Sequence, residues 1–227
     1  KRTYPRAVKQ LSPVAYYRMP IRDKGLVADP TQYSGVVLTG DGVRPPHACG
    51  VDAGGSLRVR AESTGRGGRV DSPPPLGTGH FTLAVFIYLE SQTPGGTVAT
   101  NIRGAEGNFL LALDDNGQLQ ATIRDRNGQL RSVTSSAFPP LRAWRFIAMT
   151  ADGDRLRIYE DGQLVASVPC AMMAASASET VWFGTDAGGK GLWDGRIDEL
   201  AMFDKALGDN EIAGLHQAAL AQMARPR

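Results

Sequence analysis

The chain has 227 residues, of which 42% are hydrophobic, with 25 basic and 23 acidic side chains and a formal net charge of +2. This composition supports a full apolar core, and a single all-β domain of this length is common. The small net charge provides no strong field to attract nucleic acid, and no apolar run reaches the roughly 20 residues that a membrane-spanning helix needs. Two cysteines, Cys49 and Cys170, form either one disulfide or two free thiols.

The first segment, residues 1–11, is basic and contains Pro5, which predicts a solvated linker or arm ahead of one domain over 12–227. β-branched and aromatic residues then predict a strand at 14–18. Because the chain begins at Lys1 without methionine, we expect it to be a fragment of a larger protein.

Residues 44–79 are rich in glycine and proline, which predicts short strands separated by turns. The strongest strand pattern follows at Phe81–Leu89. Its alternate residues are apolar and the intervening positions are mixed, so both faces are expected to be covered, as in the middle of a sandwich.

Three turn signals, Asn116-Gly117, Asn127-Gly128 and Asp161-Gly162, each stand between strand-like segments. Such dipeptides favour tight hairpins, so this part of the chain is predicted to form an antiparallel meander. The strands are expected near residues 97–100, 109–113, 119–124, 130–134, 144–151, 155–159, 164–169 and 180–184.

The closing strand is predicted at 193–203, followed by an amphipathic helix at about 208–223 with Ile212, Leu215, Ala219 and Leu220 on its apolar face. Adjacent acids, Asp198 and Glu199, interrupt the apolar strand. Neighbouring side chains on a strand point to opposite faces, so at least one acid is expected to point inward. A buried acid needs a hydrogen-bonding partner or a metal ion.

Two stretches carry a family pattern: Gly195-x-Ile197-Asp198-Glu199-Leu200-x-x-Phe203, and Trp144-x-Phe146-Ile147-Ala148 followed by Leu156-x-Ile158-Tyr159-x-Asp161-Gly162. This pattern resembles LamG-like jelly-roll domains of the concanavalin A-like lectin/glucanase superfamily, which are related to pentraxins. The resemblance implies an all-β fold, in which two antiparallel sheets form a jelly-roll sandwich with a short C-terminal helix.

Pentraxins and several LamG-like relatives hold calcium, and calcium prefers many oxygen ligands. The resemblance therefore makes Asp29 and Asp198, with Asp41 as a third ligand, the candidate calcium site. In the alternative, Asp198 accepts hydrogen bonds from backbone N–H groups or from an arginine.

Four aromatic residues near strand ends or turns are candidates for stacking on sugar rings: Tyr17, Tyr88, Trp182 and Trp193. For each, packing in the core or at its rim is the alternative.

Glucanases of the superfamily place acids in a Glu-x-Asp-x-x-Glu arrangement on one strand face. Here Arg196 and Ala201 stand two residues before and three after Asp198. Asp198 and Glu199 diverge, whereas retaining hydrolysis requires two carboxyl groups about 5–5.5 Å apart. The sequence therefore predicts a protein that is not an enzyme.

The expected function is non-catalytic recognition of carbohydrate or protein outside the cytoplasm, as a module of a larger cell-envelope or secreted protein. A ligand-free structural spacer and a polysaccharide-processing enzyme are the alternatives. Neither a nucleic-acid partner nor membrane insertion is expected, and the oligomeric state is open.

Overall fold

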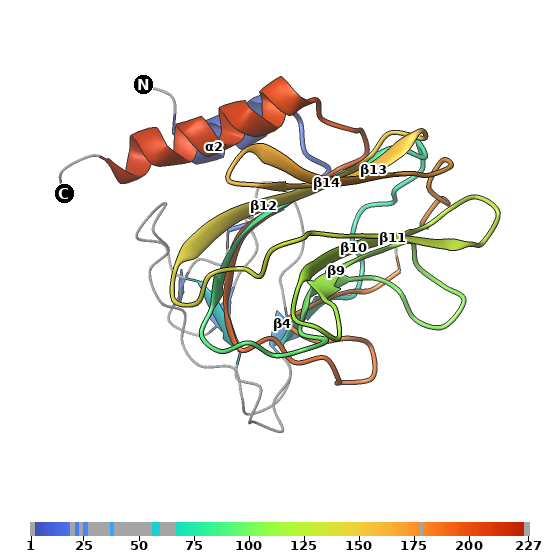
Figure 1. The fold of residues 1–227 in the computed structure, drawn as a ribbon, viewed down its shortest axis with the longest axis horizontal. Helices are drawn as coiled ribbons and strands as arrows, with labels where there is room; N and C mark the ends of the chain where they lie inside the picture. Colours follow the sequence, from blue (N-terminus) through green and yellow to red (C-terminus); the bar gives the residue numbers. More distant parts are fainter. Residues whose placement is uncertain are drawn as a thin grey trace.

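The computed structural model describes residues 3–18, 56–59, 67–177 and 179–224, together with the backbone of 21–22, 25–26 and 37–38. Two antiparallel sheets pack face to face and form the body of the described structure (Figure 1). The predicted all-β sandwich is confirmed.

The first sheet has the strand order β1-β16-β7-β12-β13-β14, with β5 beside β16. Its strands are β1 (Ala15–Tyr17), β5 (Leu57–Val59), β7 (Phe81–Leu89), β12 (Trp144–Ala151), β13 (Arg155–Glu160), β14 (Gln163–Pro169) and β16 (Gly195–Phe203).

The second sheet has the order β11-β10-β9-β8-β15-β6-β4. Its strands are β4 (Val37–Leu38), β6 (Gly68–Val70), β8 (Thr97–Thr100), β9 (Phe109–Leu113), β10 (Leu119–Arg124), β11 (Leu130–Thr134) and β15 (Val181–Phe183). The short strands β2 (Ile21–Arg22) and β3 (Gly25–Leu26) pair separately.

The inward faces of the two sheets form one apolar core. Leu83, Val85 and Ile87 of β7 belong to the same buried cluster as Phe109 and Leu111 of β9. The alternation that predicted β7 therefore corresponds to its inward face, as expected for a strand.

The outer face of the first sheet is covered by two helices, α1 (Tyr4–Gln10) and α2 (Asp209–Met223) (Figure 1). A second buried cluster lies between these helices and the sheet, and it includes Phe86 of β7 and Phe146 of β12. Both faces of the central strands are thus covered.

Helix α1 corrects the prediction of a basic linker over residues 1–11. Tyr4, Ala7 and Val8 are buried, and the Tyr4 ring lies 5.2 Å from the ring of Phe86 in an edge-on contact. These residues recur at helical spacing, so they form an apolar face. The intervening basic residues obscure this pattern in the sequence.

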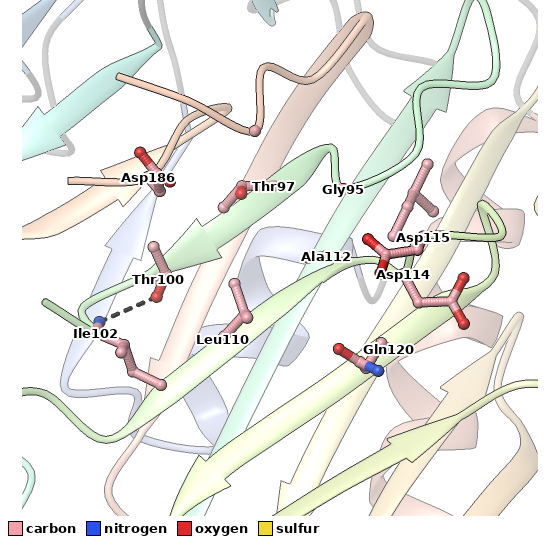
Figure 2. A pocket seen from close by; sticks show the side chains of 12 residues that line it. Gly95, Thr97, Thr100, Ile102, Leu110, Ala112, Asp114, Asp115, Gln120 and Asp186 are labelled. Atoms are coloured by element: carbon pink, nitrogen blue, oxygen red, sulfur yellow. Dashed lines mark hydrogen bonds between the residues drawn. The ribbon is translucent and has the colours of Figure 1, made fainter. Parts of the chain in front are cut away.

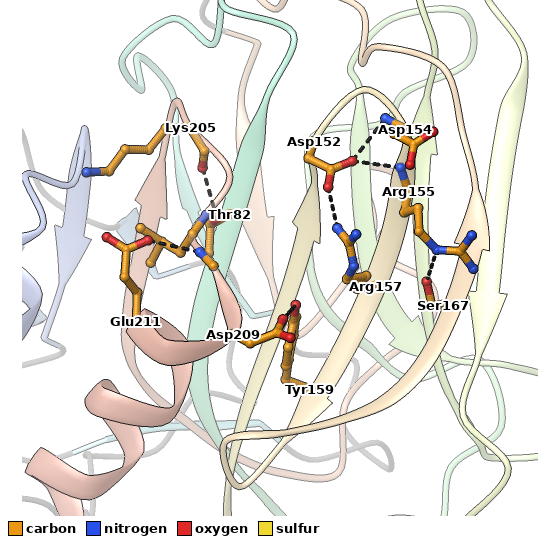
Figure 3. A network of polar contacts seen from close by, with 12 residues as sticks. Thr82, Asp152, Asp154, Arg155, Arg157, Tyr159, Ser167, Lys205, Asp209 and Glu211 are labelled. Carbon is orange, nitrogen blue, oxygen red and sulfur yellow. Dashed lines mark hydrogen bonds and ion pairs between the residues drawn. The ribbon is translucent and has the colours of Figure 1, made fainter.

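Helix α2 begins at Asp209, within one residue of the predicted position, and is fastened at its first turn. The Glu211 carboxylate accepts a hydrogen bond from the backbone N–H of Gly208 at 2.9 Å. The Tyr159 hydroxyl donates to Asp209 Oδ1 at 2.7 Å (Figure 3). These contacts cap the helix and join it to β13.

The buried face of α2 comprises Ile212, Leu215, Ala218 and Ala219. Three of the four predicted residues lie on it, whereas Leu220 is exposed. Ala218, and not the predicted Leu220, is the fourth buried residue of this face.

The three predicted hairpin turns form, but they are of two kinds. Asp161 and Gly162 both have positive φ, 49° and 80°, in a two-residue turn between paired strands. At the other two turns only Gly117 and Gly128 have positive φ. There a preceding aspartate, Asp114 or Asp125, accepts hydrogen bonds from backbone N–H groups across the turn.

Candidate functional site

The adjacent acids of the closing strand are both fully buried. The register between β16 and β7 shifts between Asp198 and Ala201, and Glu199 has a φ of +52°. This β-bulge places an extra residue in β16, so the strict alternation of faces is interrupted there. The prediction that at least one acid points inward is confirmed.

Glu199 is held by partners at the first strand of the sheet. The Tyr16 hydroxyl donates a hydrogen bond to Glu199, and Arg18 Nε lies 3.2 Å from Glu199 Oε1. Burial raises the pKa of the Tyr16 phenol well above its usual range, and the negative charge of Glu199 raises it further. Glu199 therefore links β16 to β1.

Asp198 accepts a hydrogen bond from the backbone N–H of Glu199 at 2.7 Å. This contact matches the backbone alternative, and the arginine described beside the two acids, Arg18, pairs with Glu199. The candidate ligands Asp29 and Asp41 lie outside the described residues. The carboxylate oxygens of Asp198 are of the kind that calcium prefers. Because the other two candidate ligands are not described, calcium binding there stays a prediction. Within the described part of the chain, no three acidic, histidine or cysteine side chains are grouped to hold a metal.

Two of the four candidate stacking residues lie in the core between the sheets. Tyr17 and Trp193 are both 0% exposed, and the Tyr17 ring lies 5.5 Å from the ring of Phe183. Their side chains point inward and cannot meet a sugar, so these two assignments are wrong.

Tyr88 and Trp182 are partly exposed, but they lie on different sheets. Tyr88 belongs to the first sheet, where its ring is 5.5 Å from Trp144 and has the Arg196 guanidinium 4.7 Å away. Trp182 is on β15 of the second sheet, opposite Thr100 of β8.

The outer face of the second sheet differs from that of the first sheet, because neither α1 nor α2 covers it (Figure 1). Alternation along β8, β9 and β10 turns Thr100, Leu110, Ala112, Gln120 and Thr122 away from the core. The face is made largely of small, amide and hydroxyl side chains, as expected for a surface that meets water or a polar ligand.

A pocket of about 380 Å³ lies on this face (Figure 2). Thr97, Thr100, Leu110, Ala112 and Gln120 are among the residues that line it. Aspartates stand at its two ends: Figure 2 shows Asp114 and Asp115 near Gln120, and Asp186 at the opposite side. The pocket thus combines an apolar patch with hydroxyl, amide and carboxylate groups.

The loop that carries Asp186 is fixed against β8. The backbone N–H of Thr97 donates to the carbonyl of Gly191 at 2.8 Å. Gly191 has a φ of +58°, and a Cβ there would lie 2.7 Å from the carbonyl oxygen of Gly95. Glycine is therefore required for this close approach. Asp186 Oδ1 also accepts hydrogen bonds from Gly188 and Lys190 N–H groups at 2.8 Å, which stabilises the turn.

A second pocket, of about 290 Å³, adjoins the same loop and is lined by Arg69, Trp182, Thr185 and Asp186 among others. Because Asp186 lines both pockets, they lie side by side around this residue. Trp182, predicted as a stacking residue, is thereby brought next to the larger pocket. Asp114, Asp115 and Asp186 were not among the site residues predicted from the sequence. Their position beside glycine-containing turns was the available signal.

Cys170 is a half-buried free thiol, and Cys49 lies outside the described residues. Burial, with further contributions from Asp152 and Asp154, raises the pKa of the Cys170 thiol to about 11. At neutral pH the thiol is therefore in its protonated, less nucleophilic form.

A sequence profile described as the concanavalin A-like lectin/glucanases superfamily matches residues 62–213. The match covers more than half of the chain, and the strand arrangement agrees with it. The protein belongs to this superfamily, and the predicted jelly-roll fold is confirmed.

Solved structures of the same fold include several binding domains. Domain 4 of AbnA, an extracellular arabinanase from Geobacillus stearothermophilus solved with arabinotriose, has a TM-score of 0.70 and 14% identity, covering 90% of this chain and 98% of that one. The binding domain of botulinum neurotoxin DC, in complex with SialylT, has a TM-score of 0.68 and 14% identity, covering 92% and 52%. A structure of botulinum neurotoxin type C, whose cell entry depends on interaction with two ganglioside molecules, has a TM-score of 0.67 and 17% identity, covering 92% and 51%.

At these identities the likeness establishes the fold alone, and the chain spans about half the length of the two toxin structures. Among curated protein sequences, none matches the chain. The helices in the described part of the chain lack the combined length and apolar character needed to cross a bilayer.

Proposed function

We propose that this protein is a non-catalytic carbohydrate-recognition module that binds its ligand on the outer face of the second sheet. The observation that carries the proposal is the pair of adjoining pockets around Asp186, one lined by hydroxyl and carboxylate groups and the other by Trp182. Sugars present apolar ring faces and hydroxyl groups together. An indole beside separated polar groups matches that combination.

The solved relatives support a carbohydrate over a protein as the ligand. Structures of this fold have been obtained with arabinotriose and SialylT, and a third concerns gangliosides. We place the module outside the cytoplasm for the same reason, since one of these relatives is an extracellular arabinanase. The parent is proposed to be a cell-envelope or secreted protein.

The positions of the carboxylates favour binding over hydrolysis. Asp198 and Glu199 are fully buried in β16, out of reach of a polysaccharide. In the larger pocket, Asp114 and Asp186 each use one oxygen to hold a backbone turn. Fixed structural aspartates at opposite ends of a pocket serve to orient a ligand, whereas retaining hydrolysis needs two close carboxyl groups on one bond.

The proposal is tested by screening the purified chain against a glycan array and measuring the affinity of the strongest binder by calorimetry. Trp182→Ala is expected to weaken binding by about tenfold or more, because it removes the stacking surface. Tyr88→Ala is the matched control, since it removes a partly exposed aromatic from the other sheet. Absence of binding to any glycan would favour the ligand-free spacer, and release of shortened products would favour an enzyme.

A further inference from the structure

The larger pocket presents carboxylate oxygens that have no partner within the described residues. Asp114 Oδ1 accepts hydrogen bonds from the N–H groups of Asn116 and Gln118, both at 2.9 Å. Asp186 Oδ1 likewise accepts hydrogen bonds from the N–H groups of Gly188 and Lys190. The second oxygen of each of these two carboxylates accepts no hydrogen bond from the described residues. Asp115 is exposed at the rim. Three carboxylates therefore offer free acceptor atoms to a ligand.

Donors are scarce in the same pocket. The Thr100 hydroxyl already accepts from the N–H of Ile102 at 3.0 Å (Figure 2) and donates to a backbone carbonyl at 2.9 Å. The Gln120 amide donates one N–H to the Thr134 hydroxyl at 3.3 Å, which leaves its second N–H and its carbonyl oxygen available. The Thr97 hydroxyl makes no side-chain hydrogen bond to the described residues and can donate. No lysine or arginine is found among the described residues that line this pocket.

Arginines elsewhere on the second sheet are engaged. Arg69, in the adjoining pocket, pairs with Asp71 at 2.9 Å. Arg124 donates to the backbone carbonyls of Gly104 and Gly107 at 2.7 and 3.0 Å. Neither guanidinium is among the groups that line the larger pocket.

We infer that the module selects neutral, hydroxyl-rich glycans and excludes acidic ones, and that Asp114, Asp115 and Asp186 set this selectivity. The inference rests on the proposed function and names its ligand class. A neutral sugar supplies hydroxyl donors to the free carboxylate oxygens, and hydrogen bonds to charged acceptors are the stronger kind. A uronate, sialate or sulfate group would instead face like charges, and none of the described residues that line the pocket is a cation that could offset them, which opposes binding.

The test compares neutral probes (arabinotriose, mannotriose and cellotriose) with acidic probes (trigalacturonate and 3′-sialyllactose) by calorimetry, beside the array. The wild-type chain is expected to bind at least one neutral probe or array glycan and to bind the acidic ones at least tenfold more weakly. Asp115→Lys is the informative variant, because the Asp115 side chain forms no hydrogen bond within the described residues. It is expected to raise affinity for acidic glycans at least tenfold. Asp154→Lys, the same charge change at the exposed turn after β12, is the matched control and should leave the preference unaltered.

The outcomes separate the two proposals. Wild-type binding to acidic glycans as strong as to neutral ones, still lost in Trp182→Ala, would overturn the selectivity while leaving carbohydrate recognition intact. Equal effects of Asp115→Lys and Asp154→Lys would also overturn it, because a general change in net charge would then explain the result. Binding to neither class would remove both proposals. Melting temperatures of all variants serve as the control for folding.

Discussion

The two sheets of the sandwich share one core but differ at their outer faces. On the first sheet, Phe86 and Phe146 point outward and are buried beneath α1 and α2. On the second sheet, Thr100, Gln120 and Thr122 occupy equivalent outward positions, and neither helix covers them. The side chains that point outward therefore distinguish the two faces. Outward apolar residues are buried beneath helices and add to stability, whereas outward polar residues leave a surface that a ligand could reach.

The same comparison explains why the two kinds of acid in this protein have different roles. Asp198 and Glu199 lie within the first sheet at 0% exposure, where Asp198 accepts a hydrogen bond inside β16 and Glu199 links β16 to β1. Asp114 and Asp186 lie at turns of the second sheet, where one oxygen holds the turn and the other faces a pocket. Burial makes the first pair structural, and partial exposure makes the second pair suitable for binding.

The largest expected effect concerns the core between the sheets, where a side chain should contribute to stability through packing. Trp193→Ala should reduce the free energy of unfolding by about 3–5 kcal/mol, because it empties a fully buried aromatic site. Urea denaturation followed by circular dichroism measures this change. A variant as stable as the wild type would show that Trp193 is not packed as described.

The calcium prediction asks whether the first sheet depends on an ion as well as on packing. If Asp198 binds calcium with Asp29 and Asp41, calcium at one hundred times its Kd should add about 2.7 kcal/mol of stability. A chelator should then lower the melting temperature of the wild type, while Asp198→Asn should abolish that response. A melting temperature that is indifferent to both calcium and chelator would remove the calcium site.

Glu199→Gln probes the link between β16 and β1. The amide retains an acceptor but loses the charge that faces Arg18 and the Tyr16 hydroxyl, so unfolding should become easier by about 1–3 kcal/mol. Tyr16→Phe, which removes the donor instead, is the companion variant, and the double variant should cost less than the sum of the two single changes. Strict additivity would show that the contact carries no coupling energy.

Trp182→Ala should separate binding from stability on the second sheet. We expect the free energy of unfolding to fall by less than about 1 kcal/mol, because the side chain is partly exposed, while glycan affinity falls by about tenfold. Calorimetric titration beside a melting curve gives both values. A large loss of stability would assign Trp182 to packing, and an unchanged affinity would remove it from the site.

The smallest effect concerns pH and the helix-covered face. His216 of α2 stacks on Phe146, with ring centroids 6.0 Å apart. Burial lowers the pKa of His216, while Asp161 raises it and Arg145 lowers it. The unfolded chain therefore binds the proton more readily, so stability should decline as the pH falls below the ordinary value of about 6.5 and level off below the folded-state pKa. His216→Gln should flatten that part of the stability profile, and an unchanged profile would contradict the assignment.

Much of the fold could be predicted because its strands carry local signals. The alternation of β7 and the glycine-containing turns gave strand positions within a residue or two, and the pattern around β16 gave the family. Helix α1 was missed because its apolar face at Tyr4, Ala7 and Val8 is short and interspersed with basic residues.

The site was harder to predict, because it depends on which face a residue occupies and on what covers that face. Tyr17, Tyr88, Trp182 and Trp193 resemble one another in the sequence, yet two of them lie in the core and two are partly exposed on opposite sheets. Asp186 and the β9–β10 turn line the same pocket only because of tertiary packing, since they are distant in the sequence. No local pattern encodes that proximity.

The central claim is that the uncovered face of the second sheet is the recognition surface. The most direct test is a nuclear magnetic resonance titration of the isotope-labelled chain with the neutral glycan that binds best on the array. The account predicts amide shift changes at Thr97, Leu110, Gln120 and Asp186, with the residues beneath α1 and α2 unaffected. Shift changes confined to the helix-covered sheet would contradict it. The absence of any shift change at saturating glycan would contradict it as well.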